Sequence, residues 1–110
     1  MRTDDRVQAL AVVSGIAEQD KYPYIIDLFK KQFYASPYME KYVMEALFVM
    51  GEGKYAMERM QKRFAPMVNH PFYTTLFEGW DIGPNGFGGG TVNHAWSGGP
   101  LIVIARMSVV

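Results

Sequence analysis

The chain contains no cysteine, no surplus of charge of either sign and no long apolar run. Without cysteine it has neither a disulfide framework nor a thiolate metal site, and this absence does not assign a cellular compartment. Lys plus Arg and Asp plus Glu are both 11, so there is no basic excess to attract nucleic acid or an anionic membrane surface. We therefore expect no nucleic acid or membrane partner, and no metal or other cofactor.

The longest aliphatic run, Leu101 to Ala105, is far below the ~20 residues of a membrane span. The first residues, MRTDDR, are charged, so we expect neither a signal peptide nor a membrane anchor. At 110 residues the chain fits a single region, 1–110, with a modest core. Apolar residues make up 49% and aromatic residues 15%, which is typical of helices that bury more than one face. A fragment of a larger domain would have this composition.

The sequence predicts four helices before Pro71, each with recognisable end signals. These signals are Thr3 and Gly15 around the first, Tyr22-Pro23 before the second, Ser36-Pro37 and Gly51 around a third that runs to Met50, and Gly53 before the fourth. The third carries two apolar stripes, one of Met39, Val43, Ala46, Leu47 and Met50 and one of Met44 and Phe48. Helices joined by short loops pack as antiparallel pairs, so the expected fold class is all-α, built from antiparallel helical hairpins.

The fourth helix is expected to bury Ala56, Met60, Phe64 and Met67 and to expose Glu58, Gln61 and Lys62. Residues 72–92 have no clean helical period and hold a glycine cluster, which favours a mostly non-helical connection. A final helix is predicted from about His94 to Met107, with a kink or a fresh start at Pro100. Taken alone, Leu101 to Ala105 fits a buried strand equally well.

Residues 74–105, TTLFEGWDIGPNGFGGGTVNHAWSGGPLIVIA, combine the side chains that a sugar site needs. A pyranose stacks its partly positive C–H surface on the negative face of an aromatic ring, and its hydroxyls bond carboxylates and imidazole. Glu78, Trp80, Asp81, His94 and Trp96 supply that set. Taken singly, each also has an ordinary structural explanation: a glutamate at a helix end or surface, a structural histidine, and tryptophans in a core.

TTLFEGWD followed by GGTVNHAWSGGP closely resembles the carboxy-terminal end of the catalytic domain of bacterial inverting α-L-rhamnosidases. These glycoside hydrolases are built as a six-hairpin (α/α)6 helical barrel, and the likeness is densest over residues 74–106. The resemblance implies that the last segment is the closing helix of such a barrel. It further implies that Glu78, in the W/F-E-x-W motif, is the general base, and that the sugar subsite includes Trp80, His94, Phe77, Asn93 and Trp96. Phe77 stands where many relatives carry Trp, which keeps an aromatic wall but removes an indole donor.

Inverting hydrolysis needs two carboxyl groups about 6.5–9.5 Å apart. In the resembling family the general acid lies in an earlier segment of the barrel, so this chain would be the C-terminal portion of a catalytic domain, inactive alone, with a rhamnosyl glycan or glycoside as its ligand. Missing helices would leave apolar faces open, and we expect self-association through the double stripe of residues 37–50. The alternative is a non-catalytic helical module that binds carbohydrate or protein.

Overall fold

In the computed structural model, the described part of the chain comprises residues 4–69, 76, 80 and 95–108, and it is all-helical, with no strand. In chain order its elements are α1 (Asp5–Val13), the 3-10 turn η1 (Gln19–Lys21), α2 (Tyr22–Lys31), α3 (Glu40–Val49), α4 (Gly53–Val68), the 3-10 turn η2 (Ala95–Gly98) and α5 (Gly99–Ser108). The predicted all-α fold class is thus confirmed for these residues. The prediction for residues 72–92 falls outside them, apart from Leu76 and Trp80.

The helix starts differ from the predicted ones in two places, the first at the N-terminus of α1. Asp4, and not Thr3, is the N-cap, because its Oδ1 accepts hydrogen bonds from the backbone N–H groups of Arg6 (3.0 Å) and Val7 (3.2 Å). Gly15 and Gly51 follow α1 and α3 with φ of 83° and 81°, a left-handed conformation that glycine adopts without strain.

The second adjustment is at the start of α3. Ser36 Oγ accepts a hydrogen bond from the Met39 N–H (3.3 Å), and the Ser36 carbonyl accepts one from the Glu40 N–H (2.9 Å). Ser36 therefore caps a single turn of residues 37–39, and the helix itself begins only at Glu40.

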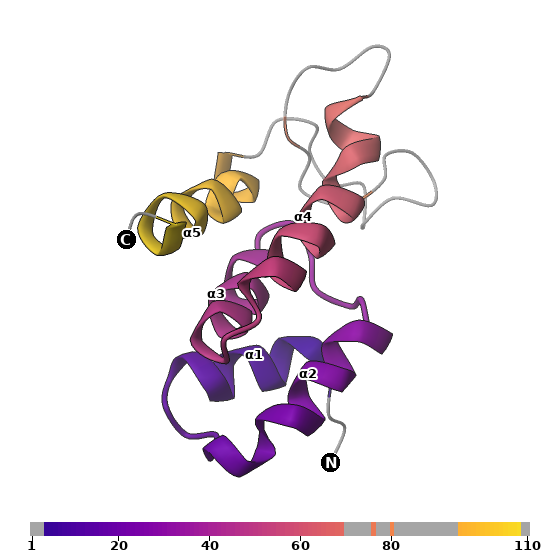
Figure 1. Ribbon diagram of the computed structural model, residues 1–110. Helices are drawn as coiled ribbons and strands as arrows, with labels where there is room; N and C mark the ends of the chain where they lie inside the picture. The colour runs from indigo at the N-terminus through magenta and orange to yellow at the C-terminus, as the bar shows by residue number, and fades with distance from the viewer. Residues whose placement is uncertain (1–3, 70–75, 77–79, 81–94, 109–110) are drawn as a thin grey trace.

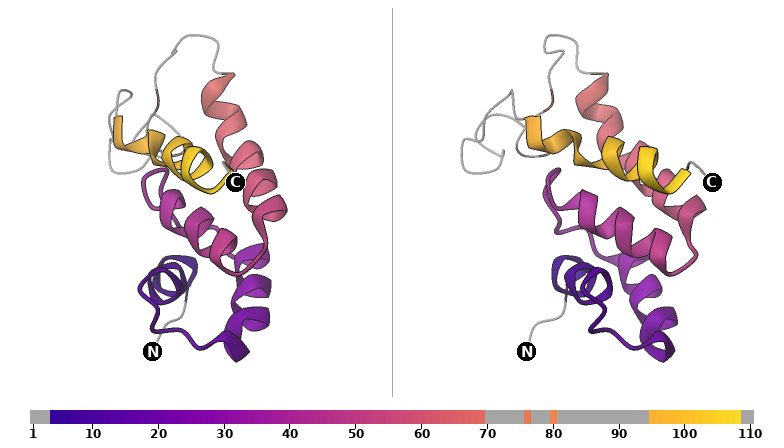
Figure 2. Two further views of the ribbon diagram at one scale, coloured as in Figure 1. Left: turned by 60° about the vertical axis from the view of Figure 1, so that its left-hand side comes forward. Right: turned by 90° about the vertical axis from the view of Figure 1, so that its left-hand side faces the viewer.

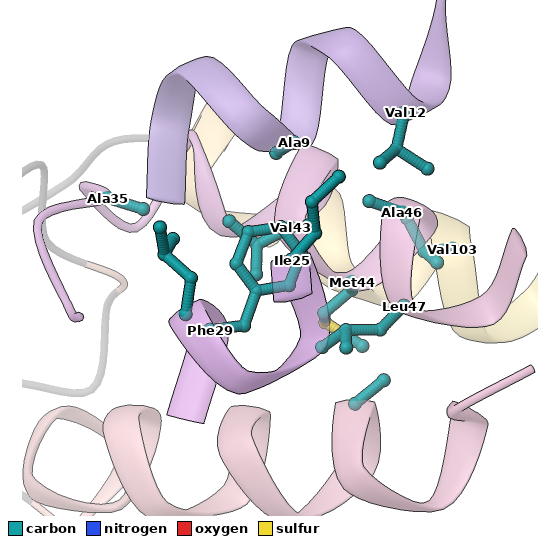
Figure 3. Packing of buried hydrophobic residues seen from close by; sticks show 12 residues of the cluster. Ala9, Val12, Ile25, Phe29, Ala35, Val43, Met44, Ala46, Leu47 and Val103 are labelled. Carbon is teal, nitrogen blue, oxygen red and sulfur yellow. The ribbon is translucent and has the colours of Figure 1, made fainter. Parts of the chain in front are cut away.

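Helix α3 is the centre of the fold and packs against α1, α4 and α5 (Figures 1 and 2). Four of its apolar side chains are buried: Val43, Met44, Ala46 and Leu47. Figure 3 shows them meeting side chains of α1, α2 and α5 in one cluster. The expectation that the double stripe of residues 37–50 marks an open face is therefore wrong, because the chain's own helices cover it and every member of the stripe is buried or half-buried.

The faces of α4 match the prediction, with Ala56, Phe64 and Met67 buried and Met60 half-buried, and with Glu58, Gln61 and Lys62 exposed. The fresh start predicted at Pro100 is also found, since α5 begins at Gly99 after η2 and runs through the segment that periodicity alone could not assign. Within the described residues, none of the helices has both the length and the apolar character required to cross a membrane.

Candidate functional site

Trp80 is the one predicted site residue whose side chain the structure describes. The other predicted residues, Glu78, Phe77, Asn93 and His94, lie outside the described residues, as does Asp81. For Trp96 only the backbone is described, and it lies in η2. The roles of Glu78 and His94 in one sugar site therefore stay predictions, and the site is built here from Trp80 and the groups that hold it.

Trp80 is half-buried and held by three different contacts. Its Nε1 donates a hydrogen bond to the Ala35 carbonyl at 2.7 Å. Its ring meets the Phe64 ring edge to face, with 4.9 Å between centroids and 74° between planes, and the Arg63 guanidinium lies over it at 4.1 Å from the centroid. Because the indole N–H is already bonded, this tryptophan can offer a sugar its ring surface but no hydrogen-bond donor.

Arg63 is itself fixed by three hydrogen bonds. Its Nη1 donates to Glu40 Oε1 at 2.6 Å and to the Ala35 carbonyl at 2.9 Å, and its Nη2 donates to the Phe33 carbonyl at 2.9 Å. Burial lowers the pKa of Arg63, against the opposing effect of the Glu40 carboxylate. The Ala35 carbonyl thus accepts from both Arg63 and Trp80, so the two stacked groups share one oxygen.

Behind Arg63 lies a fully buried ion cluster centred on Arg59. The Arg59 Nη2 is 2.7 Å from Asp5 Oδ2 and 2.8 Å from Glu40 Oε1, and all three side chains are 0% exposed. Desolvation works to lower the pKa of Arg59, but the hydrogen bonds and charges of Glu40 and Asp5 outweigh it and raise that pKa. We call Asp5, Glu40, Arg59 and Arg63 the ion network.

The ion network holds the backbone of residues 32–36, the loop between α2 and α3. Asp5 accepts hydrogen bonds from the Tyr34 N–H (3.2 Å) and the Ala35 N–H (3.1 Å). Arg59 Nη1 donates to the carbonyls of Phe29 (2.6 Å) and Gln32 (3.0 Å). Buried backbone groups need partners, and here charged side chains of α1 and α4 provide them. The loop that anchors Trp80 is therefore held in place from two helices.

Sequence reasoning missed the ion network, although one signal for half of it was present. Arg59 and Arg63 stand four residues apart among the inward-facing apolar positions of α4. Cations on a buried helical face must be paired, so this spacing predicts buried carboxylate partners. It does not say which carboxylates, because Asp5 is 54 positions from Arg59.

Two hollows adjoin these residues. An apolar cavity of 150 Å³ between the end of α4 and the start of α5 is lined in part by Phe64 and Leu76. It is smaller than the roughly 300–1,000 Å³ of typical ligand pockets. A hollow of 330 Å³ beside the ion network falls within that range and is lined by Lys30, Phe33, Tyr55, Glu58, Arg59, Lys62 and Arg63. The buried cation in its wall, Arg59, is already neutralised by Asp5 and Glu40.

No protein-family model, curated protein or solved structure matches the chain. Within the described residues, no group of three or more histidine or acidic side chains is placed to hold a metal ion.

Proposed function

We propose that the chain is the C-terminal portion of the catalytic domain of an α-L-rhamnosidase-like glycoside hydrolase of the six-hairpin barrel type. Its part in the reaction is the general base, Glu78, and a portion of the sugar subsite. The all-helical fold of the described residues is compatible with a piece of such a barrel. The motif TTLFEGWD carries the proposed base and the fixed Trp80 together.

The observation that carries the proposal is the anchoring of Trp80 to the loop at Ala35. Glu78 stands two positions before Trp80 in the sequence. An aromatic ring that is held by a hydrogen bond and ring contacts, close in sequence to a candidate base, suits a sugar site, because stacking orients the sugar before water attacks.

In this mechanism Glu78 accepts a proton from a water molecule whose oxygen attacks the anomeric carbon. The bond from that carbon to the leaving oxygen breaks on the opposite face, which inverts the configuration. The leaving oxygen takes its proton from a general acid that this chain does not supply. Trp80 stacks on the sugar, Asn93 and His94 bond its hydroxyls, and Phe77 and Trp96 form further aromatic walls.

The base can be tested without the missing acid by choosing a substrate whose leaving group needs little protonation. The chain should be inactive on glycosides, whose leaving oxygen needs the missing general acid, but fluoride leaves without protonation. We therefore expect the chain to release fluoride from the rhamnosyl fluoride that carries the substrate's anomeric configuration, faster than the buffer does. Aryl rhamnosides with poor leaving groups should stay intact. Glu78→Gln should lower the enzymatic part of fluoride release by about 10²-fold or more, because it removes proton acceptance and keeps the shape.

Glu58→Gln is the matched control, since Glu58 is an exposed carboxylate on α4, and it should leave fluoride release unchanged. Equal rates for the parent chain and Glu78→Gln would remove Glu78 from the role of base. Specific binding of L-rhamnose without any fluoride release would favour the alternative, a non-catalytic module that binds carbohydrate.

A further inference from the structure

The guanidinium of Arg63 and the indole of Trp80 contact each other and form a unit, and hydrogen bonds hold each of the two groups in place. The guanidinium carbon lies over the indole ring, 4.1 Å from its centroid, and both groups donate to the Ala35 carbonyl, at 2.9 Å and 2.7 Å. Arg63 also reaches Glu40 at 2.6 Å, which ties the unit to α3. Only a planar group with several donors in a fixed fork can stack on a ring and bond two sides at once, which arginine does and lysine cannot.

Arg63 is the separable member of the ion network. Without it, Glu40 would keep hydrogen bonds from Arg59 to both carboxylate oxygens, at 3.1 Å and 2.8 Å to Oε1 and at 3.2 Å to Oε2. The Arg63 side chain also keeps 11% of its surface exposed, whereas those of Arg59, Glu40 and Asp5 have none. Its hydrogen bonds to the loop and its contact with Trp80 are therefore its distinctive contribution.

We propose that Arg63 is a positioning residue for Trp80, and that Glu40 acts through Arg63 by holding the guanidinium against the ring. On this assignment, which rests on the proposed function for its sugar-binding part, Arg63 sets the orientation of the ring surface that stacks on the C–H face of a pyranose. Because the indole N–H is bonded to Ala35, recognition of sugar hydroxyls falls to other residues and Trp80 contributes stacking alone.

The test uses the full 110-residue chain, labelled with ¹⁵N, and the variants Arg63→Met and Arg63→Lys. The indole N–H signal of Trp80, identified by its loss in Trp80→Phe, is followed by hydrogen exchange without any ligand. L-rhamnose is then titrated into each variant, with D-glucose as the control sugar. Lys62→Met removes the same charge from the neighbouring, exposed position of α4 and serves as the matched control.

We expect exchange of the Trp80 indole proton to become about tenfold faster in both Arg63 variants, since stacking of a partly desolvated cation contributes on that scale. The dissociation constant for L-rhamnose should rise by a similar factor, with circular dichroism unchanged. Lysine should not rescue either effect, because it keeps the charge but not the planar stack. Lys62→Met should behave as the parent chain.

Unchanged indole exchange in a folded Arg63 variant would overturn the positioning role, whatever the sugar does. If Arg63→Met does not fold, Arg63→Lys decides, since it retains the charge beside Glu40. Faster indole exchange combined with no L-rhamnose binding by the parent chain would support positioning by Arg63 and refute the proposed function. The two ideas therefore fail separately.

Discussion

Replacing Arg59 by methionine should remove a large part of the stability of the fold. Arg59 is 2% exposed as a residue. Its side chain donates to Asp5, to Glu40 and to two backbone carbonyls, those of Phe29 and Gln32. Breaking a buried ion pair by removing one partner costs about 3–5 kcal/mol. The Phe29 carbonyl would keep the Tyr55 hydroxyl as a donor at 3.1 Å, whereas the Gln32 carbonyl would lose the donor described here, which costs about 1 kcal/mol. We therefore expect a loss of about 4–6 kcal/mol, against a total of about 5–15 kcal/mol for a domain.

The assay is urea unfolding followed by far-ultraviolet circular dichroism. With a slope of about 2 kcal/mol per molar urea, the midpoint should fall by about 2–3 M. Asp27→Asn is the control, because it breaks the ion pair between Asp27 and Lys31 on α2. The side chains of Lys31 and Asp27 are 71% and 60% exposed. Such surface pairs contribute about 0–1 kcal/mol, so the control should scarcely move the midpoint.

A double-mutant cycle tests the mechanism behind this loss. Asp5→Asn added to Arg59→Met removes the carboxylate that has lost its cation, so the double variant should be more stable than the two single losses together imply, by about 0.5–3 kcal/mol. A loss for Arg59→Met below about 1 kcal/mol, the upper end for exposed pairs, would mean that the ion network is not desolvated. Strict additivity in the cycle would refute the coupling of Asp5 to Arg59.

Three further predictions concern the surface, the pH and a turn. Light scattering at high micromolar concentration should show self-association, and Leu101→Glu should weaken it, because Leu101 and Ile102 of α5 are 66% and 53% exposed; a monomeric parent chain would contradict this. The hydrogen bond from Arg6 lowers the pKa of Asp4 below its ordinary 3.8. The ionised Asp4 therefore stabilises the fold above pH 3.8, and this stabilisation is lost as the pH falls through the lowered pKa. Acid titration of Asp4→Asn, which keeps the cap, should lack this step. Gly51→Ala should cost about 1–2 kcal/mol by thermal unfolding, because φ is 81° and a Cβ there would meet no atom within 4 Å, so the cost is backbone strain alone.

Local signals were enough to place the helices. The positive φ of Gly15 and Gly51, the proline at the start of α2 and the apolar face of α4 depend on a few neighbouring residues, and each was predictable from the sequence. The errors at the helix starts are of one residue for α1 and one turn for α3. They arose because Asp4 competes with Thr3 as a cap, and because the turn after Ser36 does not continue directly into helix.

Long-range pairings were not predictable in the same way. Nothing near Asp5 in the chain shows that it will bond Arg59, since a first-turn aspartate is ordinarily explained by the helix dipole. The apolar face expected to stay open was predicted at residues 37–50, where the chain's own helices cover it. An apolar stripe says that a helix surface is covered, but not whether the cover comes from the same chain.

For the candidate site, too, local residue types were predictable and long-range contacts were not. The residue types around Trp80 predicted a ring that a sugar can stack on, and its half-buried position is compatible with that. That its N–H is bonded to Ala35 and that Arg63 lies over its ring depend on a loop 45 positions earlier and on α4, so the sequence alone could not reveal them.

The ion network has a consequence for how the chain folds during synthesis. Asp5 and Glu40 emerge from the ribosome well before Arg59, and until α4 is made neither carboxylate has that cation to accompany it into the interior. Burying them without it would be far more costly than leaving them in water. We therefore expect α1, the loop at 32–36 and α3 to pack together only after α4 has supplied Arg59.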